Sequence, residues 1–422
     1  MKLKALSTAM ILATVPMTGA FAAALDRSGQ SMAAFFQPGN YFEAGISVLD
    51  PDVSGTSAAN LGNQATGDMG EDYYFPSAAL KFQVTNNFSV GLIYDQPFGA
   101  DAEYNTGNAA FSTLPGQTVS IPGVGANIPL AALNAENQVT NVEVKTQNLS
   151  LILGYQPTEN WNLYAGGVYQ TAEGNVSLRG FAYGGSGAFG GYDASMSEDE
   201  GFGWLAGIAY QIPEIALKTS LTYRSEIEHE LQATETMFFG NVPAANVVQA
   251  LGGTPQAGKT NITTPQSVNL DFQSGIMADT VAFANIRWVN WKDFSIRPNY
   301  FGQIAQNNPA VGKPINIVDY SDDQWSATAG VGRKFNEQWA GNVSVGWDSG
   351  AGNPVTTLGP TEGYWNVGLG LQFSPAANYF IAGGVKYFWL GDATAKTAIN
   401  NNIGKFEDNN AIAYGLKMGY RF

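Results

Sequence analysis

The chain has 422 residues, of which 50 are glycine, 12% are aromatic and only 13% are charged, and its formal net charge is −15. A soluble domain usually carries about 25% charged residues, so this composition favours a chain embedded in a membrane. The acidic balance excludes nucleic acid as a partner, since phosphate binding requires basic patches. The lack of cysteine excludes disulfides, thiolate metal sites and cysteine nucleophiles.

Residues 1–22 follow the plan of a secretory signal peptide. A basic start, Met1–Lys4, precedes an apolar run from Ala5 to about Val15 and a small-residue triplet that ends at Ala22. The apolar run is shorter than the roughly 20 residues that a spanning helix needs, which leaves a buried N-terminal helix as the alternative. No later stretch is long and apolar enough for a helical anchor, so the mature chain is either soluble or a barrel.

Segments with strict two-residue alternation recur along the rest of the chain and predict strands. In the last segment Tyr414, Leu416 and Met418 alternate with small or polar residues, and aromatic residues at strand ends suit the two membrane interfaces. The predicted strands lie near residues 41–49, 73–85, 87–98, 139–156, 160–182, 200–212, 214–237, 262–277, 279–294, 322–335, 337–349, 362–374, 377–391 and 410–422.

The connections between these fourteen segments alternate in length. Short turns are expected at Asn86-Asn87, Thr158-Glu159, Pro213, Ala278, Asn336 and Pro375-Ala376. Long loops are expected near residues 50–72, 99–138, 183–199, 238–261, 295–321, 350–361 and 392–409. This asymmetry is typical of a bacterial outer-membrane barrel with periplasmic turns and extracellular loops. We therefore predict an all-β fold, a transmembrane antiparallel β-barrel of 14 strands in the bacterial outer membrane.

One face of each predicted strand carries uncharged apolar residues and must meet lipid. A charged base near the bilayer midplane would cost about 2–4 kcal/mol on that face. The bases of the other face should therefore point into the lumen, and these are Lys81, Lys218, Arg224, Arg287, Lys386, Lys417 and Arg421.

Several short motifs, in this order and spacing, are similar to those of the FadL-type family, the outer-membrane transporters of long-chain fatty acids and other hydrophobic compounds. The motifs are Asp26-Arg27-Ser28-Gly29, Phe35–Asn40, Pro51–Gly55, Tyr94-Asp95-Gln96-Pro97-Phe98-Gly99, Leu221–His229, Thr264-Pro265-Gln266-Ser267 and Trp288–Phe294. They span nearly the whole chain, and the family's fourteen strands match the number counted above.

The resemblance implies three parts: the signal peptide of residues 1–22, a short N-terminal hatch of residues 23–40, and the barrel of residues 41–422. The sequence departs from the family in the hatch, because family members carry about forty residues there with an Asn-Pro-Ala motif. Here Gln37-Pro38-Gly39 stands in that place. The shorter segment either plugs the barrel or is partly replaced by loops.

The family also implies energy-independent diffusion from an extracellular groove, through an apolar lumen site, to a lateral exit at a kink in the third strand. Pro97 cannot donate to the strand ladder and Gly99 loosens the backbone, although a plain strand end is equally compatible with this pattern. We assign gating to Phe35, Phe36, Pro38, Pro97, Phe98 and Gly99.

Two long loops have apolar residues suited to a groove, since an exposed apolar patch on such a loop marks binding. Loop-on-loop packing is the alternative for both of these loops. The groove candidates are Phe181, Tyr183, Phe189, Met237, Phe238, Phe239, Val247, Val248 and Leu251.

A ligand carboxylate would need a basic partner in the lumen. Arg224, Arg287, Lys386 and Lys417 are the candidates, because arginine in particular binds carboxylates bidentately. Each base could instead pair with a lumen acid such as Glu226, Glu228 or Asp271 and serve the fold alone.

We thus expect passive uptake of hydrophobic small molecules, fatty acids first among them, by a monomer without cofactor or metal. The expected partners are lipopolysaccharide, outer-membrane lipid and the barrel-assembly machinery. A general diffusion porin is one alternative, although porins have a charged open constriction. An outer-membrane enzyme is another, but the single histidine, His229, falls by parity on the lipid side with Tyr223 and Ile227, where it could not serve as a base.

The terminal residue Phe422 ends the last alternating segment and resembles the insertion signal of outer-membrane proteins. Deleting Phe422, or replacing it with a charged residue, should reduce assembly into the outer membrane because the assembly machinery reads this strand. Heat-modifiable barrel in isolated outer membranes measures the effect. An unchanged amount of folded barrel in the variant would contradict the prediction.

Overall fold

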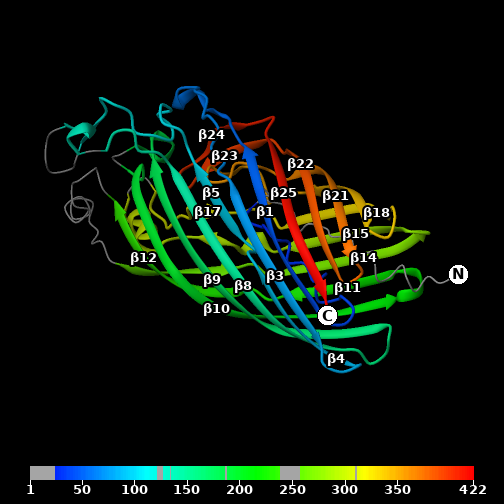
Figure 1. Ribbon diagram of the computed structural model, residues 1–422. Coiled ribbons are helices and arrows are strands. Elements are labelled where there is room, and N and C mark those ends of the chain that lie inside the picture. Colours follow the sequence, from blue (N-terminus) through cyan, green and yellow to red (C-terminus); the bar gives the residue numbers. More distant parts are fainter. Residues whose placement is uncertain (1–23, 121–126, 134, 186–187, 238–256, 309–310) are drawn as a thin grey trace.

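The computed structural model describes residues 24–120, 127–133, 135–185, 188–237, 257–308 and 311–422. It is a closed antiparallel barrel, as the alternation predicts, with long connections at one end and short turns at the other (Figure 1). The predicted signal peptide, residues 1–22, lies outside the described residues and stays a prediction. No helix among the described residues is long and apolar enough to cross a membrane.

The fourteen predicted strands are confirmed. The barrel sheet has seventeen strands that form fourteen spans, because three spans consist of two strands each. The spans are β1 (Tyr41–Asp52), β3 (Tyr73–Gln83), β4 and β5 (Phe88–Asp95, Gly99–Glu103), β8 (Asn141–Tyr155), β9 (Trp161–Arg179), β10 (Gly191–Ile212), β11 and β12 (Leu217–Arg224, Ile227–Met237), β13 and β14 (Gly258–Thr264, Ser267–Met277), β15 (Thr280–Val289), β18 (Gln324–Lys334), β19 (Trp339–Asp348), β21 (Tyr364–Ala376), β22 (Tyr379–Leu390) and β25 (Asn410–Arg421).

The first span closes the barrel, since β1 pairs with β25 along its whole length and with β3 on its other side. The C-terminus lies at the end with the short turns (Figure 1). In a bacterial barrel this end is periplasmic, so the long connections are extracellular. The predicted turn at Pro375-Ala376 is displaced, because β21 continues through Ala376.

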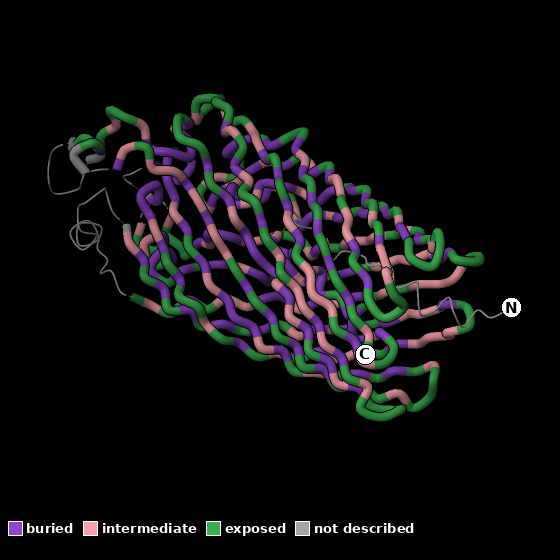
Figure 2. Tube along the Cα trace, viewed as in Figure 1, coloured by how far each residue is buried: buried purple, intermediate pink, exposed green. Residues whose placement is uncertain are grey.

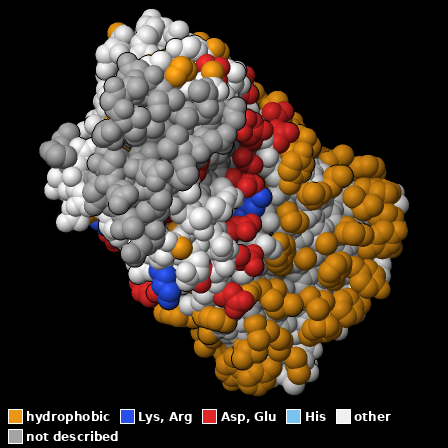
Figure 3. All heavy atoms as spheres, turned by 90° about the vertical axis from the view of Figure 1, so that its left-hand side faces the viewer, with side chains coloured by type: hydrophobic (Ala, Val, Ile, Leu, Met, Phe, Trp, Pro, Cys, Tyr) orange, Lys and Arg blue, Asp and Glu red, His pale blue; other side chains and the backbone are white. Residues whose placement is uncertain are grey.

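Buried and exposed residues alternate along the strands (Figure 2), as expected where side chains point alternately inward and outward. On β25, Leu416 and Met418 are 62% and 56% exposed, while Lys417 between them is buried. The outward residues form an apolar belt, and a band of acidic side chains separates it from the extracellular loops (Figure 3). Trp347 pairs across strands with Trp365, and Trp365 pairs with Trp389, which places three exposed tryptophans side by side at the upper edge of the belt.

Three spans are interrupted, and at each interruption the inward parity changes. The third span breaks at residues 96–98, the seventh at 225–226 and the eighth at 265–266. Below its break the seventh span buries even-numbered residues such as Thr222 and Arg224, and above it buries odd-numbered residues such as Leu231. At the seventh and eighth breaks the inward residues on the two sides, Arg224 and Ile227, and Thr264 and Ser267, are three residues apart. Because the side-chain period of a strand is two, an odd separation exchanges the inward and outward faces.

This change of parity overturns the predicted orientation of four residues. Ile227 and His229 were expected on the lipid side, but both are buried on the lumen side. Glu226 and Glu228 were expected among the lumen acids, but both are exposed. Of the acids that the sequence placed in the lumen, Asp271 does face inward, where it accepts a hydrogen bond from Asn285.

The sixth span begins earlier than the sequence predicts. β10 starts at Gly191 rather than near residue 200, so the predicted loop over residues 183–199 is wrong from residue 191 onward. A bulge between Met196 and Asp199 interrupts its alternation. The two-residue pattern is therefore broken within one strand, which hides the first half of that strand from a periodicity argument.

The extracellular loops fold over the barrel into a cap with its own small sheets. β2 (Thr56–Ser57), β24 (Asn400–Phe406), β23 (Ala393–Thr397) and β20 (Val355–Thr356) form one sheet, and β16 (Ser295–Ile296) pairs with β17 (Val318–Asp319). β6 (Thr118–Ser120) pairs with β7 (Asn127–Pro129), and the helix α3 spans Asn299–Asn307. Buried aromatic residues of these loops, including Tyr104, Tyr183 and Phe301, join the upper lumen in one apolar cluster.

Candidate functional site

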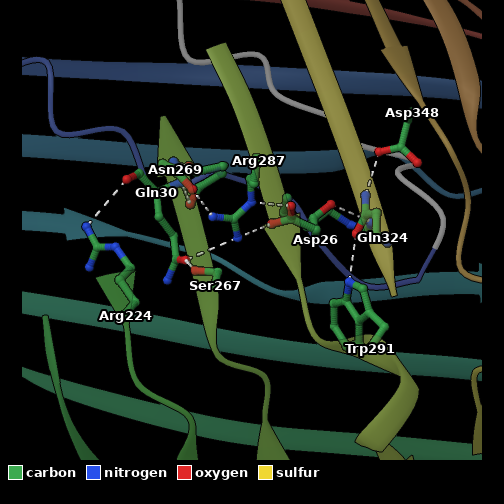
Figure 4. Close-up of polar contacts among 12 residues, drawn as sticks. Asp26, Gln30, Arg224, Ser267, Asn269, Arg287, Trp291, Gln324 and Asp348 are labelled. Carbon is green, nitrogen blue, oxygen red and sulfur yellow. Dashed lines mark hydrogen bonds and ion pairs between the residues drawn. The ribbon is translucent and has the colours of Figure 1, made fainter. Parts of the chain in front are cut away.

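A buried ion pair joins the N-terminal segment to the barrel wall (Figure 4). The Arg287 guanidinium on β15 donates from Nε to Asp26 Oδ2 at 2.7 Å and from Nη2 to Asp26 Oδ1 at 3.0 Å. Its Nη1 donates to Asn269 Oδ1 at 2.7 Å. Both charged side chains are almost fully buried. The bidentate geometry and the additional hydrogen bond to the Asn269 side chain offset the free-energy cost of removing the charges from water.

Side chains of the barrel wall also donate hydrogen bonds to backbone carbonyls of this segment. Asn269 Nδ2 donates to the carbonyl of Gly29 at 2.7 Å, and Arg224 Nη2 donates to the carbonyl of Gln30 at 3.4 Å. Lys218 Nζ donates to the carbonyl of Phe36 at 3.0 Å. Because buried carbonyls need partners, these bonds explain how a segment without regular secondary structure is held inside the lumen.

The predicted orientation of the seven bases is confirmed, but most of them bind protein groups. Lys81 and Arg421 donate to Gln37, so five of the seven bases bond to residues 26–37. Lys417 pairs with Glu43 at 3.4 Å, and Lys386 is half-buried on the inward face of β22. Of the four bases proposed for a ligand carboxylate, Arg224 and Arg287 therefore hold the N-terminal segment, and Lys417 holds an acid of β1.

The N-terminal segment also docks on the interruption of the third span. Arg27 N donates to the carbonyl of Pro97 at 2.6 Å, and Gly99 N donates to the carbonyl of Leu25 at 2.9 Å. Below these bonds the Ser28 hydroxyl donates to Asp95 Oδ2. We call residues 25–28 and 95–99 the partition, because they separate two cavities.

The upper cavity lies on the extracellular side of the partition. Its two threonine hydroxyls are engaged: Thr146 exchanges bonds with the Phe98 backbone, and Thr264 donates to Gln170. No lysine or arginine is among the residues that line this cavity: Leu25, Phe98, Val144, Thr146, Ala172, Glu173, Gly174, Met196, Leu231, Ile262, Thr264, Pro265, Trp291, Phe294 and Ile296. A lining of this chemistry suits a hydrophobic small molecule.

The loop after β15 covers the upper cavity. Trp291 packs edge-on against Phe98 and donates from Nε1 to Gln324 Oε1 at 2.7 Å, while Gln324 is itself bound to Asp348 (Figure 4). Farther along this loop, the backbone N–H groups of Tyr300 and Phe301 at the start of α3 donate to the buried Glu235 carboxylate. These two anchors fix the aromatic roof of the cavity.

The ring of Tyr320 packs against Trp291 and Phe294, so its phenol lies in the apolar surroundings of the roof. Burial raises the pKa of the Tyr320 phenol, since the charged form would lose its hydration.

The lower cavity lies across the partition from the upper one, against β1, β3 and β4. It is lined by inward residues such as Ser47, Asp95 and Ile93, and also by outward residues such as Val48, Pro76 and Tyr94. Residues of both faces of the wall therefore contribute to this cavity. The sheet has a gap at this place, because residues 73–77 of β3 pair with β1 but have no strand ladder on their other side.

The predicted groove residues lie in different surroundings. Phe181 is exposed on the cap, whereas Tyr183 and Phe189 are buried in it. Tyr183 shares a hydrogen bond with Thr357, and Phe189 packs on Phe301. Met237 is the last residue of β12. Phe238, Phe239, Val247, Val248 and Leu251 lie outside the described residues, so the groove stays a prediction.

The predicted gating residues flank the two cavities. Phe35 and Phe36 pack on Tyr164 with ring centroids 5.8 and 5.3 Å apart, while Pro38 is exposed. Pro97, Phe98 and Gly99 are buried, with Pro97 and Gly99 bonded to the N-terminal segment through their backbones and Phe98 lining the upper cavity. A gating role for any of these residues stays a prediction.

Several important residues were missed by sequence reasoning. Pro76 lies in β3 where the strand is an edge, and a proline inside an alternating run is itself a signal of an edge strand. Asp26, Gln30 and Glu235 gave no usable signal, since the partner of Asp26 lies 261 residues away in the chain. Among the described residues, no group of three or more metal-ligating side chains is present.

The fold and the apolar cavities define an outer-membrane β-barrel channel. Residues 123–422 match the family described as outer membrane protein transport protein (OMPP1/FadL/TodX), and the chain belongs to this family of transport proteins. It is therefore a bacterial outer-membrane protein of a family of hydrophobic-compound channels. A comparison with curated proteins finds no match.

Solved structures share the fold at low sequence identity. A Pseudomonas aeruginosa FadL homologue is similar with a TM-score of 0.67 and 15% identity over 92% of both chains. The P. putida toluene transporter TodX is similar with a TM-score of 0.61 and 13% identity over 92% of this chain and 91% of that chain. The CymD monoaromatic hydrocarbon channel is similar with a TM-score of 0.53 and 11% identity over 92% of this chain and 90% of that chain.

The Asp26–Arg287 pair generates a prediction about the N-terminal segment. Arg287→Met should leave the Asp26 carboxylate buried without its partner, which costs about 3–5 kcal/mol. Amide hydrogen exchange of residues 25–37 should then accelerate by roughly a hundredfold or more. The double variant Asp26→Asn with Arg287→Met should exchange more slowly than the single variant, because no unpaired charge remains.

The exposed pair Lys334–Glu337 provides the control, since surface pairs contribute little. Lys334→Met should leave the exchange of residues 25–37 unchanged. Equal exchange in wild type and Arg287→Met would refute the anchoring role of the pair.

Proposed function

We propose that the protein carries hydrophobic compounds passively across the outer membrane. A compound binds in the upper cavity, passes the partition and leaves sideways from the lower cavity into the membrane. The observation that carries this proposal is the pair of cavities on the two sides of one small contact, residues 25–28 against 95–99. A water-filled pore would not help a molecule that avoids water, whereas apolar cavities with a wall gap would.

Passage requires residues 25–28 to move away from the third span. The direct backbone bonds between the two halves of the partition are few, with Arg27 N and Ser28 N on Pro97 and Gly99 N on Leu25. The N-terminal segment is also tied to the barrel wall. Asp26 pairs with Arg287, and Gln30 accepts hydrogen bonds from Arg287 and Ser267. A ligand that fills the upper cavity beside Leu25 and Phe98 presses on both halves of the partition at once.

The substrate class is hydrophobic, and its finer identity is a proposal. The names of TodX and CymD refer to toluene and monoaromatic hydrocarbons, which supports small uncharged compounds. Long-chain fatty acids remain the class expected from the sequence. We also propose that residues 23–40 form the hatch, that the protein is a monomer, and that it interacts with lipopolysaccharide and the barrel-assembly machinery.

The two alternatives from the sequence have less support. Residues 24–40 lie across the lumen and bond to several walls, whereas a general porin has an open charged constriction. For enzyme activity, His229 is now on the lumen side, where it contacts Gln170 at 2.8 Å and Asp199 at 3.5 Å. Neither of these two contacts in the described part of the chain is a serine or threonine hydroxyl, and the family is one of transporters.

Filling the upper cavity tests this function. Gly174 on β9 is buried and lines the cavity, so Gly174→Phe places a ring inside it. Uptake of labelled hexadecane by intact cells should fall at least tenfold, because the ring takes the place of the ligand. Gly167 on the same strand is exposed with nothing within 4 Å of an added Cβ, so Gly167→Phe is the matched control. Equal uptake by the two folded variants would refute a route through this cavity.

A further inference from the structure

The lower cavity combines an apolar outer part with a polar inner part. Pro76 contributes apolar surface on the membrane side, and Phe75 and Ile93 contribute apolar surface beside it on the inward side. The inner part carries Ser28 of the N-terminal segment and Asp95 at the end of β4. A molecule that lies here with its apolar body toward the wall gap therefore presents its other end to Asp95.

The Asp95 carboxylate has one oxygen without a partner. Its side chain is 7% exposed, and its Oδ2 accepts a hydrogen bond from the Ser28 hydroxyl. Its Oδ1 is buried and has no hydrogen-bond partner among the described residues. Buried carboxylate oxygens are almost always satisfied, and leaving one unsatisfied is costly. Because Asp95 lines the cavity, a ligand donor that reaches Oδ1 would satisfy it.

The charges around Asp95 balance one another. The positive charges of Arg224 and Arg287 act on Asp95, and Arg287 is already paired with Asp26. Lys417, which also lines the cavity, is paired with Glu43. Arg27, the other base that lines the cavity, donates to the Asp26 carbonyl and stacks on the Tyr73 ring. A ligand carboxylate would therefore meet Asp95 and Glu43 and would have to compete with these contacts for a cation, whereas a neutral donor needs only an acceptor.

We infer that the lower cavity is a subsite for the hydroxyl group of an otherwise hydrophobic compound. The ligand hydroxyl donates to Asp95 Oδ1, and the apolar body lies against Phe75, Pro76 and Ile93. The inference rests on the proposed lateral route and names the substrate class that this route favours. Hydroxylated hydrophobes should pass better than hydrocarbons of the same length, and carboxylates should pass worse than the hydroxylated compounds.

The test compares 1-dodecanol, dodecane and dodecanoate, which share one chain length. Initial uptake of each labelled compound is measured in intact cells, above the uptake by cells that lack the protein. Wild type should prefer 1-dodecanol over both others. Asp95→Ala should lower the ratio of 1-dodecanol to dodecane uptake about tenfold, since a hydrogen bond to a charged acceptor is lost, and the ratio corrects for any effect of the lost Ser28 contact on passage itself.

Two further variants keep the test decisive. Asp95→Asn retains the shape and the contact with Ser28, so it should fold even if Asp95→Ala does not, and it should lower the ratio by a smaller factor. Asp101→Asn on β5 of the same span also removes an acid but lines neither cavity, and it should leave the ratio unchanged.

The outcomes separate the inference from the proposed function. If wild type takes up dodecane and 1-dodecanol equally, and Asp95→Asn changes neither, the inference is overturned and the lateral route stands. In that case water alone satisfies Asp95 Oδ1. If wild-type cells take up none of the three compounds faster than cells without the protein, the proposed function fails first.

Discussion

The anchoring of a short irregular segment inside the lumen is the constraint on which the rest of the structure depends. Residues 25–37 cannot satisfy their own backbone groups, so the wall must supply donors, and it does so with Lys218, Arg224 and Asn269. The buried Asp26–Arg287 pair ties the start of the segment to β15, and backbone bonds to Pro97 and Gly99 dock it on the third span. As a consequence, most of the lumen bases are committed to the fold, and the two cavities are separated.

The interruptions of the wall build the cavities at this level. Phe98 follows the break of the third span, Leu231 lies above that of the seventh, and Pro265 lies in that of the eighth; all three line the upper cavity. An unbroken barrel would present one parity inward along each whole strand and would leave no gap beside β3. Each interruption lacks some of the backbone hydrogen bonds that a continuous strand would make to its neighbours. Hydrogen bonds from the cap and the N-terminal segment replace part of them.

Alternation in the sequence predicted the fourteen spans, the belt and the inward bases, because these depend on local periodicity. It failed where periodicity changes, so His229 and Ile227 were placed on the wrong face. The motifs that carried the family resemblance, Tyr94–Gly99, Leu221–His229 and Thr264–Ser267, fall on the three breaks. The motifs thus marked the positions of the three breaks but did not predict the change of inward parity there. The partner of each base was unreadable, since it depends on contacts between distant parts of the chain.

The central claim is that residues 25–28 must leave the third span before a hydrophobic compound can pass. The chain has no cysteine, so a single engineered disulfide can lock the partition. Ser28 and Asp95 are in side-chain contact, and Ser28→Cys with Asp95→Cys would join them. Hexadecane uptake by intact cells should be blocked in the oxidised double variant and restored by reduction. Equal uptake by the oxidised and reduced forms would contradict the account.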